Sequence, residues 1–131
     1  MAQHIPISEE TERVASEIVD ACLKVHVALG PGLLESVYES CLCHELSRRG
    51  LTCLRQTPVA IEYEGLRIEA GLRIDLLVDD LVIMELKAVD EMNPVYEAQL
   101  LTYMKLANKR LGFLVNFNAV LLKQGLKRMI R

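Results

Sequence analysis

The chain has 131 residues, of which 51% are hydrophobic and 25% charged, and its formal net charge is −3. A chain of this length and composition can bury a substantial core, which excludes a disordered protein and predicts a single domain over residues 1–131. No stretch approaches the roughly 18 consecutive apolar residues of a transmembrane helix, and residues 1–6 lack the basic region and apolar run of a signal peptide. We therefore expect a soluble, cytoplasmic protein without a membrane partner.

Two helices are predicted at the start of the chain. Ser8 can cap the first, whose apolar residues recur at helical spacing up to Leu29. The glycines and proline of residues 30–32 end this helix. The second helix is predicted from about 33 to 49, with Gly50 as its C-terminal stop.

Beyond these helices the apolar residues alternate with period 2, which predicts strands. In chain order we expect strands at 52–63, 66–78 and 81–89, a helix from Asn93-Pro94 to about 108, and strands at 111–117, 120–122 and 126–130. Pro58 suits an edge strand, and the last two strands would form a terminal pair around Gly125. This order of elements predicts one α/β sandwich with a mixed sheet.

Charge is distributed unevenly along the chain. Up to Glu97 there are 18 acidic and 8 basic residues, and after it there are 7 basic residues and no acidic one. The seven are Lys105, Lys109, Arg110, Lys123, Lys127, Arg128 and Arg131. Such a segment can attract the phosphates of a nucleic acid, or it can pair with the acidic part of the same molecule, and charge alone leaves both open.

The four cysteines are predicted to be reduced thiols, because the chain shows no secretory signal. They are Cys22, Cys41, Cys43 and Cys53. Cys41 and Cys43 with His44 could make a zinc-binding adaptor, but zinc ligand pairs usually have two to four residues between them. Small core or surface thiols are therefore the favoured interpretation.

Three ionisable residues that could form a catalytic or metal-binding site lie on two neighbouring predicted strands. Asp75 precedes the turn between these strands, and Glu85 and Lys87 follow it. Glu85 and Lys87 are two residues apart, so they share one face of a strand. Asp75 can converge with Glu85 at cross-strand distance. The pattern therefore predicts two carboxylates and one ammonium group at one place.

Two carboxylates beside a main-chain carbonyl offer the hard oxygen ligands that Mg²⁺ or Mn²⁺ prefers. Lys87 could then position an attacking water and balance the charge of an attacked phosphate. The alternative is a structural ion pair in which Lys87 neutralises Glu85. Because such a pair inside an apolar strand is costly unless it is well satisfied, we favour a functional site.

Asp75 followed by Glu85-Leu86-Lys87 resembles the paired-acid and Glu-x-Lys core of the PD-(D/E)XK nuclease superfamily. The segment GLLESVY at 32–38 resembles the G-x-x-E-x-x-Y motif of the GxxExxY protein family. The segment QLLTY at 99–103 is similar to the Q-x-x-x-Y helix motif of RecB-like nucleases, and GFLVNF at 112–117 to the family's G-L-L-I-N-F strand.

The resemblance runs from about Ser8 to the end of the chain. It implies a restriction-endonuclease-like fold, with a mixed central sheet flanked by helices. It further implies that Asp75 and Glu85 are metal-binding carboxylates, that the Leu86 carbonyl is a further ligand, and that Lys87 is the catalytic lysine.

The resemblance also implies roles for residues on two helices. Glu35 matches the extra acid that RecB-like nucleases bring to the metal. Gln99 and Tyr103 are four residues apart on the third predicted helix, so they share a face. They would bind a phosphate of the substrate or hold Lys87. For Tyr38 we favour a core aromatic with a satisfied hydroxyl group.

One departure from the family pattern concerns Tyr96. Members often carry a histidine three residues before the glutamine of the helix motif, and this chain has Tyr96 there. None of His4, His26 or His44 is placed to replace it. If that histidine contributes to metal or phosphate binding, activity could be reduced or shifted.

Two functions follow from the sequence. The first is a nuclease that hydrolyses phosphodiester bonds in DNA or RNA with Mg²⁺ or Mn²⁺. The second is a catalytically weak or inactive nuclease-fold module that acts in binding or homo-oligomeric assembly. The high apolar fraction favours a homodimer, with the apolar stripe of the first helix and the terminal strands as candidate surfaces. The sequence does not decide between DNA and RNA or between endo- and exonucleolytic cleavage.

Overall fold

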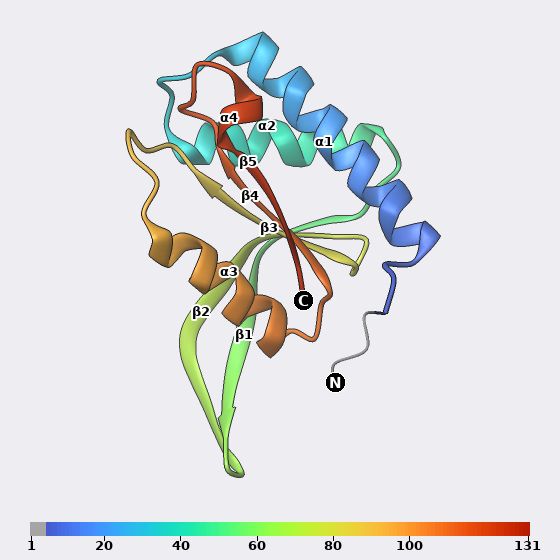
Figure 1. The fold of residues 1–131 in the computed structure, drawn as a ribbon, viewed down its shortest axis with the longest axis vertical. Coiled ribbons are helices and arrows are strands. Elements are labelled where there is room, and N and C mark those ends of the chain that lie inside the picture. Colours follow the sequence, from blue (N-terminus) through green and yellow to red (C-terminus); the bar gives the residue numbers. More distant parts are fainter. Residues whose placement is uncertain (1–4) are drawn as a thin grey trace.

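The computed structural model describes residues 5–131, so His4 and most of the segment that argues against a signal peptide lie outside the described residues. The elements in chain order are α1 Glu9–Leu29, α2 Glu35–Arg48, β1 Cys53–Tyr63, β2 Leu66–Val78, β3 Val82–Lys87, α3 Pro94–Leu106, β4 Leu111–Asn116, α4 Leu122–Gly125 and β5 Leu126–Ile130 (Figure 1). None of the helices among residues 5–131 has the length and hydrophobicity that crossing a membrane requires.

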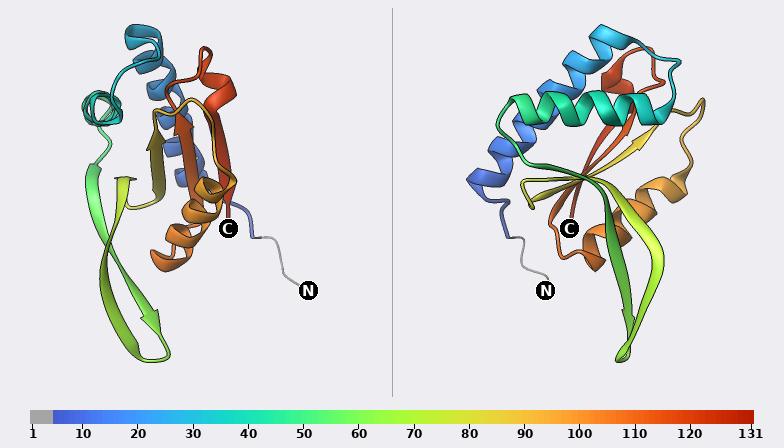
Figure 2. Two further views of the ribbon diagram at one scale, coloured as in Figure 1. Left: turned by 90° about the vertical axis from the view of Figure 1, so that its left-hand side faces the viewer. Right: turned by 180° about the vertical axis from the view of Figure 1, so that it is seen from behind.

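The strands form one mixed sheet in the order β1-β2-β3-β4-β5. β3 and β4 are parallel, and the other neighbours are antiparallel. Helices α1 and α2 pack on one face and α3 on the other (Figure 2). The predicted mixed sheet with flanking helices is therefore confirmed, and β1, which contains Pro58, is an edge strand.

The first helix begins as the sequence predicts. The Ser8 side chain caps α1 by accepting the backbone N–H of Thr11 at 3.1 Å. The apolar stripe of this helix lies in the core, where Val14, Ile18, Ala21 and Cys22 are fully buried and Val25 is nearly so. This stripe is covered by the sheet and α2, so it is not available as a dimer surface and that expectation is corrected.

The turn between α1 and α2 is fixed by Tyr38. Its hydroxyl donates to the carbonyl of Gly30 at 2.6 Å and accepts the N–H of Leu33 at 3.1 Å. Gly30 and Gly32 have φ values of 70° and 97°, which favour glycine. Tyr38 is fully buried, as expected for a core aromatic with a satisfied hydroxyl group. The turn sets where α2 begins, and Glu35 is its first residue.

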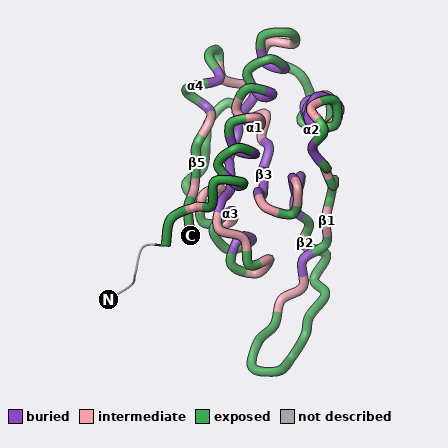
Figure 3. The backbone as a smooth tube through the Cα atoms, turned by 90° about the vertical axis from the view of Figure 1, so that its right-hand side faces the viewer, coloured by how far each residue is buried: buried purple, intermediate pink, exposed green. Residues whose placement is uncertain are grey.

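Strands β1 and β2 form a long hairpin that extends well beyond the other strands (Figures 1 and 2). Its tip is a tight turn at Glu64 and Gly65, whose φ values of 46° and 85° match the hairpin turn with two left-handed residues. The distal part is exposed on both strands, whereas the residues of β2 that pair with β3 are buried (Figure 3). Asp75 lies near the boundary between the two parts.

The prediction of a strand at 120–122 is wrong. The chain instead makes the short helical turn α4, which buries Leu122, and only then enters β5 beside β4. Gly125 explains this path, because a Cβ atom there would lie 2.3 Å from the carbonyl oxygen of Asn116. Gly125 packs directly on the backbone at the end of β4. The predicted strand pair around Gly125 would not bring this residue so close to Asn116.

Candidate active site

The two predicted acids lie where β2 and β3 separate. The last residues paired between these strands are Leu76 and Met84. At the next position, hydrogen bonds to the carboxylates of Asp75 and Glu85 replace the backbone hydrogen bonds between the two strands. The Asp75 N–H donates to Glu85 Oε1 at 3.3 Å, and the Leu86 N–H donates to Asp75 Oδ2 at 2.8 Å. Each carboxylate is thus fixed by the backbone of the opposite strand.

Alternation along β3 separates the site from the main core. Met84 and Leu86 are buried against α1 and α2, whereas Ile83 belongs to the cluster under α3. Glu85 and Lys87 follow the alternation of Ile83, so they share the face that α3 covers. Glu85 is 5% exposed, and Lys87 is partly exposed at the end of the strand.

Glu85 is the most strongly perturbed carboxyl group of the site. Its burial and the nearby charge of Asp75 raise the pKa of Glu85 to about 9. The Lys87 ammonium lowers this pKa, but by less than burial raises it. At neutral pH, without a cation, Glu85 is therefore protonated. A cation placed beside both acids would favour the ionised form.

Lys87 does not form the ion pair that was the alternative interpretation. No carboxylate within residues 5–131 lies within 4 Å of its Nζ atom. The ammonium instead lies 4.4 Å from the ring centroid of Tyr96. Tyr96 therefore presents its aromatic face to Lys87.

Glu35 lies close enough to Asp75 for the two charges to interact. Partial withdrawal of its carboxylate from water raises the pKa of Glu35, as does the charge of Asp75, whereas Lys87 lowers it. Within residues 5–131, however, no three His, Cys, Asp or Glu side chains are grouped closely enough to form a metal site by themselves. Asp75 and Glu85 would need ligands other than side chains of these four types.

The Leu86 carbonyl lies on the correct side to be such a ligand. The N–H and C=O of a strand residue point to the same edge of the strand, and the Leu86 N–H points to Asp75. Its carbonyl therefore faces the gap between β2 and β3, whereas the Lys87 carbonyl accepts Phe117 N–H on the other side. Mg²⁺ commonly uses one or two carboxylates and retains several waters, so this donor set fits the ion.

Two residues of this region were not predicted. Glu39, one turn after Glu35 on α2, is buried and accepts a hydrogen bond from Gln56 Nε2 at 2.7 Å. Gln56 Nε2 also lies 3.5 Å from Asp75 Oδ1, so it joins the two acids. Spacing of four from Glu35 could have indicated Glu39. No sequence pattern indicates Gln56. Its side chain reaches the site because the backbone has an unusual positive φ of 51° at this position within β1.

The two polar residues of the helix motif contact each other. Gln99 Nε2 donates to the hydroxyl of Tyr103 at 2.9 Å. Tyr103 is buried in the cluster between α3 and the sheet, and Gln99 is partly exposed. They share a face of α3 as expected, but the side chain that contacts the Lys87 ammonium is Tyr96.

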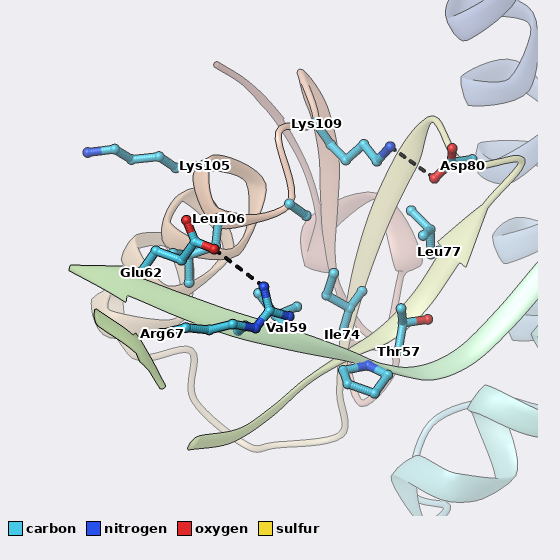
Figure 4. A pocket seen from close by; sticks show the side chains of 13 residues that line it. Thr57, Val59, Glu62, Arg67, Ile74, Leu77, Asp80, Lys105, Leu106 and Lys109 are labelled. Atoms are coloured by element: carbon cyan, nitrogen blue, oxygen red, sulfur yellow. Dashed lines mark hydrogen bonds and ion pairs between the residues drawn. The ribbon is translucent and has the colours of Figure 1, made fainter. Parts of the chain in front are cut away.

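A separate pocket of about 570 Å³ lies between the hairpin and the C-terminal end of α3 (Figure 4). Val59, Ile74 and Leu77 line its apolar part, and an ion pair between Lys109 and Asp80 at 2.9 Å borders it. Asp75, Glu85 and Lys87 do not line this pocket. It is therefore distinct from the carboxylate site.

Several basic residues of the C-terminal segment are paired within the molecule. Lys127 pairs with Glu97 at 2.6 Å, and Arg128 pairs with Glu12. Arg110 donates to the carbonyls of Ile5 and Pro6. Intramolecular pairing, one of the two interpretations of the basic segment, thus accounts for much of its charge.

Comparison with known proteins agrees with this geometry. A family model described as the PD-(D/E)XK nuclease superfamily matches residues 12–129. Searches of curated proteins and of solved structures found no match. The matched region contains both acids, the lysine, Glu35 and the Gln99–Tyr103 pair, and it extends over nearly the whole chain. The chain belongs to the PD-(D/E)XK nuclease superfamily.

Proposed function

We propose that this chain is a nuclease that hydrolyses phosphodiester bonds in DNA or RNA with Mg²⁺ or Mn²⁺. One observation carries the proposal: Asp75 and Glu85 are held together where β2 and β3 separate, each by the backbone of the other strand. A buried acid with a pKa of about 9 beside a second acid is costly for the fold unless it serves a purpose.

In this proposal Asp75, Glu85 and the Leu86 carbonyl hold the cation. A divalent cation bound there would polarise the phosphate and favour formation of a hydroxide nucleophile. Lys87, which is free of carboxylate partners within residues 5–131, orients the attacking water and neutralises charge on the phosphate. Glu35 tunes the site through its charge.

The remaining expectations belong to the same proposal. Gln99 and Tyr103 bind a phosphate of the substrate as a hydrogen-bonded pair. Lys105 and Lys123, which form no ion pair in the described part of the chain, are available to a nucleic acid backbone. We further propose that the chain acts as one domain of the GxxExxY type within the RecB-like branch. We place it in the cytoplasm, where its four free cysteines would remain reduced.

Calorimetric titration with Mg²⁺ and Mn²⁺ tests the proposed metal site without requiring knowledge of the substrate. Wild type should bind, and Asp75→Asn combined with Glu85→Gln should not. Glu62→Gln, which neutralises an exposed acid on the hairpin, is the matched control and should bind like wild type. If wild type fails to bind at millimolar metal, or the double variant binds equally well, the proposed metal site is wrong.

Cleavage is tested next with single- and double-stranded DNA and RNA oligonucleotides in Mn²⁺. Glu85→Gln should abolish cleavage while the circular dichroism spectrum and unfolding transition show a folded protein. A clean preparation of this variant that cuts as fast as wild type would refute the catalytic assignment.

A second candidate function, homo-oligomeric assembly, is favoured by the distal hairpin. Strand register places Ile61, Tyr63, Leu66 and Ile68 on one face. Tyr63, Leu66 and Ile68 are 66%, 58% and 41% exposed, and this face carries no charge. We propose that it packs against the same face of a second copy, because two uncharged faces meet without repulsion.

The charges of the distal hairpin lie on its other face. Arg67 pairs there with Glu62 at 3.3 Å and with Glu69 at 3.6 Å. Glu62 and Arg67 line the pocket of Figure 4, and the four apolar residues do not. The outer edge of β5 is a poorer surface for a second copy, since Lys127 and Arg128 form ion pairs there with Glu97 and Glu12 and charged residues blunt an edge strand.

Light scattering over a range of concentrations tests this assembly. Wild type should show a concentration-dependent dimer, and Tyr63→Ser with Leu66→Ser should be monomeric. Val27→Ser removes an apolar side chain that is 83% exposed on α1, and it should leave the dimer intact. A wild type that stays monomeric at high concentration would exclude the hairpin dimer.

A further inference from the structure

The contact between Lys87 and Tyr96 joins the end of β3 to the first turn of α3. Lys87 is the last residue of β3, and Tyr96 is the third residue of α3. The Nζ atom lies 4.4 Å from the ring centroid, within the range of a cation–π interaction. The contact therefore connects the proposed catalytic lysine to the helix that covers its face of the sheet.

Nothing else in the described chain holds the ammonium group. Two acids from two elements lie near enough to interact with its charge: Glu35 from α2 and Glu85 from β3. Neither of them approaches Nζ within 4 Å. The side chain of a lysine has four rotatable bonds, so without a partner it would sample many positions.

Both sides of the contact are rigidly attached. The Lys87 carbonyl accepts the N–H of Phe117 at 2.9 Å, which continues the pairing with β4. On the other side the Asn93 side chain accepts the N–H of Val95 at 2.9 Å, and the Asn93 carbonyl accepts the N–H of Tyr96 at 2.9 Å. The start of α3 is thus fixed by its cap.

The segment between β3 and α3 is also tied to the sheet. Asn116, at the end of β4, accepts the N–H of Val89 at 3.1 Å and donates to the Val89 carbonyl at 2.9 Å. This double hydrogen bond prevents the connection from moving freely. The ring of Tyr96 is therefore held at a defined place relative to Lys87.

We propose that Tyr96 is a positioning residue, whose ring face holds the Lys87 ammonium at the carboxylate site. This inference rests on the proposed nuclease function. An aromatic face attracts the cation without accepting any one N–H bond, so all three N–H groups of Lys87 stay available to water and phosphate. A carboxylate partner in the same place would occupy them.

Nuclear magnetic resonance of lysine-labelled protein tests the position directly. The ring current of Tyr96 should shift the ε-methylene protons of Lys87 upfield in wild type. Tyr96→Leu should lose this shift, and Tyr96→Phe, which keeps the ring, should retain it. Val95→Ala, on the same turn and 57% exposed, is the control and should leave the Lys87 signal unchanged.

Kinetics then test what the position does. Tyr96→Leu should lower kcat by roughly 3- to 30-fold, the range expected for loss of one cation–π contact, with unchanged Mg²⁺ affinity. Tyr96→Phe should retain most of the wild-type kcat. This difference between the two variants would not be expected if substitution at Tyr96 simply impaired folding. Equal loss in both variants would overturn the role of the ring.

The possible failures are distinguishable. If the Lys87 signals are the same in wild type and Tyr96→Leu, the contact does not exist in solution and the inference is wrong. If the shift disappears while kcat does not change, the contact exists but positions nothing. A wild type that binds Mg²⁺ but cleaves none of the oligonucleotides refutes the nuclease function and any catalytic role of Tyr96, whereas the shift still decides the contact.

Discussion

The ring of Tyr38 stacks on that of Phe117, with a centroid distance of 4.7 Å and an interplanar angle of 7°. This stack joins α2 to the residue that follows β4, and both side chains are fully buried. The same tyrosine hydroxyl fixes the turn before α2. Tyr38 therefore connects the placement of Glu35 to the core of the protein.

Tyr38→Phe should keep the stack but lose both hydrogen bonds of the hydroxyl. We expect a loss of about 1–3 kcal/mol in the free energy of unfolding, because the Gly30 carbonyl and the Leu33 N–H lose their partner. Urea denaturation measures this loss. Tyr63→Phe, at an exposed position on the hairpin, should cost almost nothing. Equal midpoints for the two variants would contradict the role of the hydroxyl.

Stability of the metal-free protein should fall as pH rises. The pKa of Glu85 is raised from its ordinary value of 4.5 to about 9 in the folded state, so the folded state binds the proton more tightly than the unfolded state. The stabilisation is fully present below pH 4.5 and is lost progressively up to about pH 9. The raised pKa of Glu35 acts in the same direction.

Urea denaturation in EDTA between pH 5 and pH 9 measures this effect. We expect a loss of roughly a few kcal/mol over this interval, since one pKa unit corresponds to about 1.4 kcal/mol. Glu85→Gln should remove most of the pH dependence, and Mg²⁺ should oppose it in wild type alone. A flat profile in wild type would show that Glu85 is ionised in the folded protein.

Gly125→Ala should destabilise the C-terminal turn. The added Cβ would lie 2.3 Å from the Asn116 carbonyl oxygen, a backbone atom that cannot move aside without disturbing β4. We expect a loss of about 1–3 kcal/mol by thermal or urea unfolding. Gln124→Ala, at the exposed preceding position, is the matched control. An unchanged midpoint for Gly125→Ala would mean that the turn is looser than the structure shows.

Elements with strong local signals could be predicted from the sequence. The Ser8 cap, the Asn93-Pro94 start of α3 and the bounds of β2 at 66–78 agree with the structure. The segment at 120–122 could not be predicted, because its apolar residues favour a strand locally. What decides its path is the close packing of Gly125 on β4, a contact between segments distant in sequence.

The site could be predicted only in part for a similar reason. Alternation places Glu85 and Lys87 on one face, but the separation of β2 from β3 at Asp75 depends on pairing across the whole sheet. Gln56 joins the site through a left-handed residue inside a strand, which no pattern indicates. The sequence marked Tyr96 only as a departure from a family histidine, and it gave no sign that the ring face would contact Lys87.

The crosswise hydrogen bonds where β2 and β3 separate also bear on what the presence of both acids in a related protein would mean. Strands that part expose unpaired backbone groups, and these promote aggregation. Asp75 and Glu85 close the first open position, so they protect the sheet as well as forming the candidate site. Under the proposed nuclease function, a relative without catalysis would still benefit from both acids. Within the part of the chain that the structure describes, the Lys87 side chain makes no such hydrogen bond to the backbone. Substitution at Lys87 is therefore the clearer mark of an inactive relative.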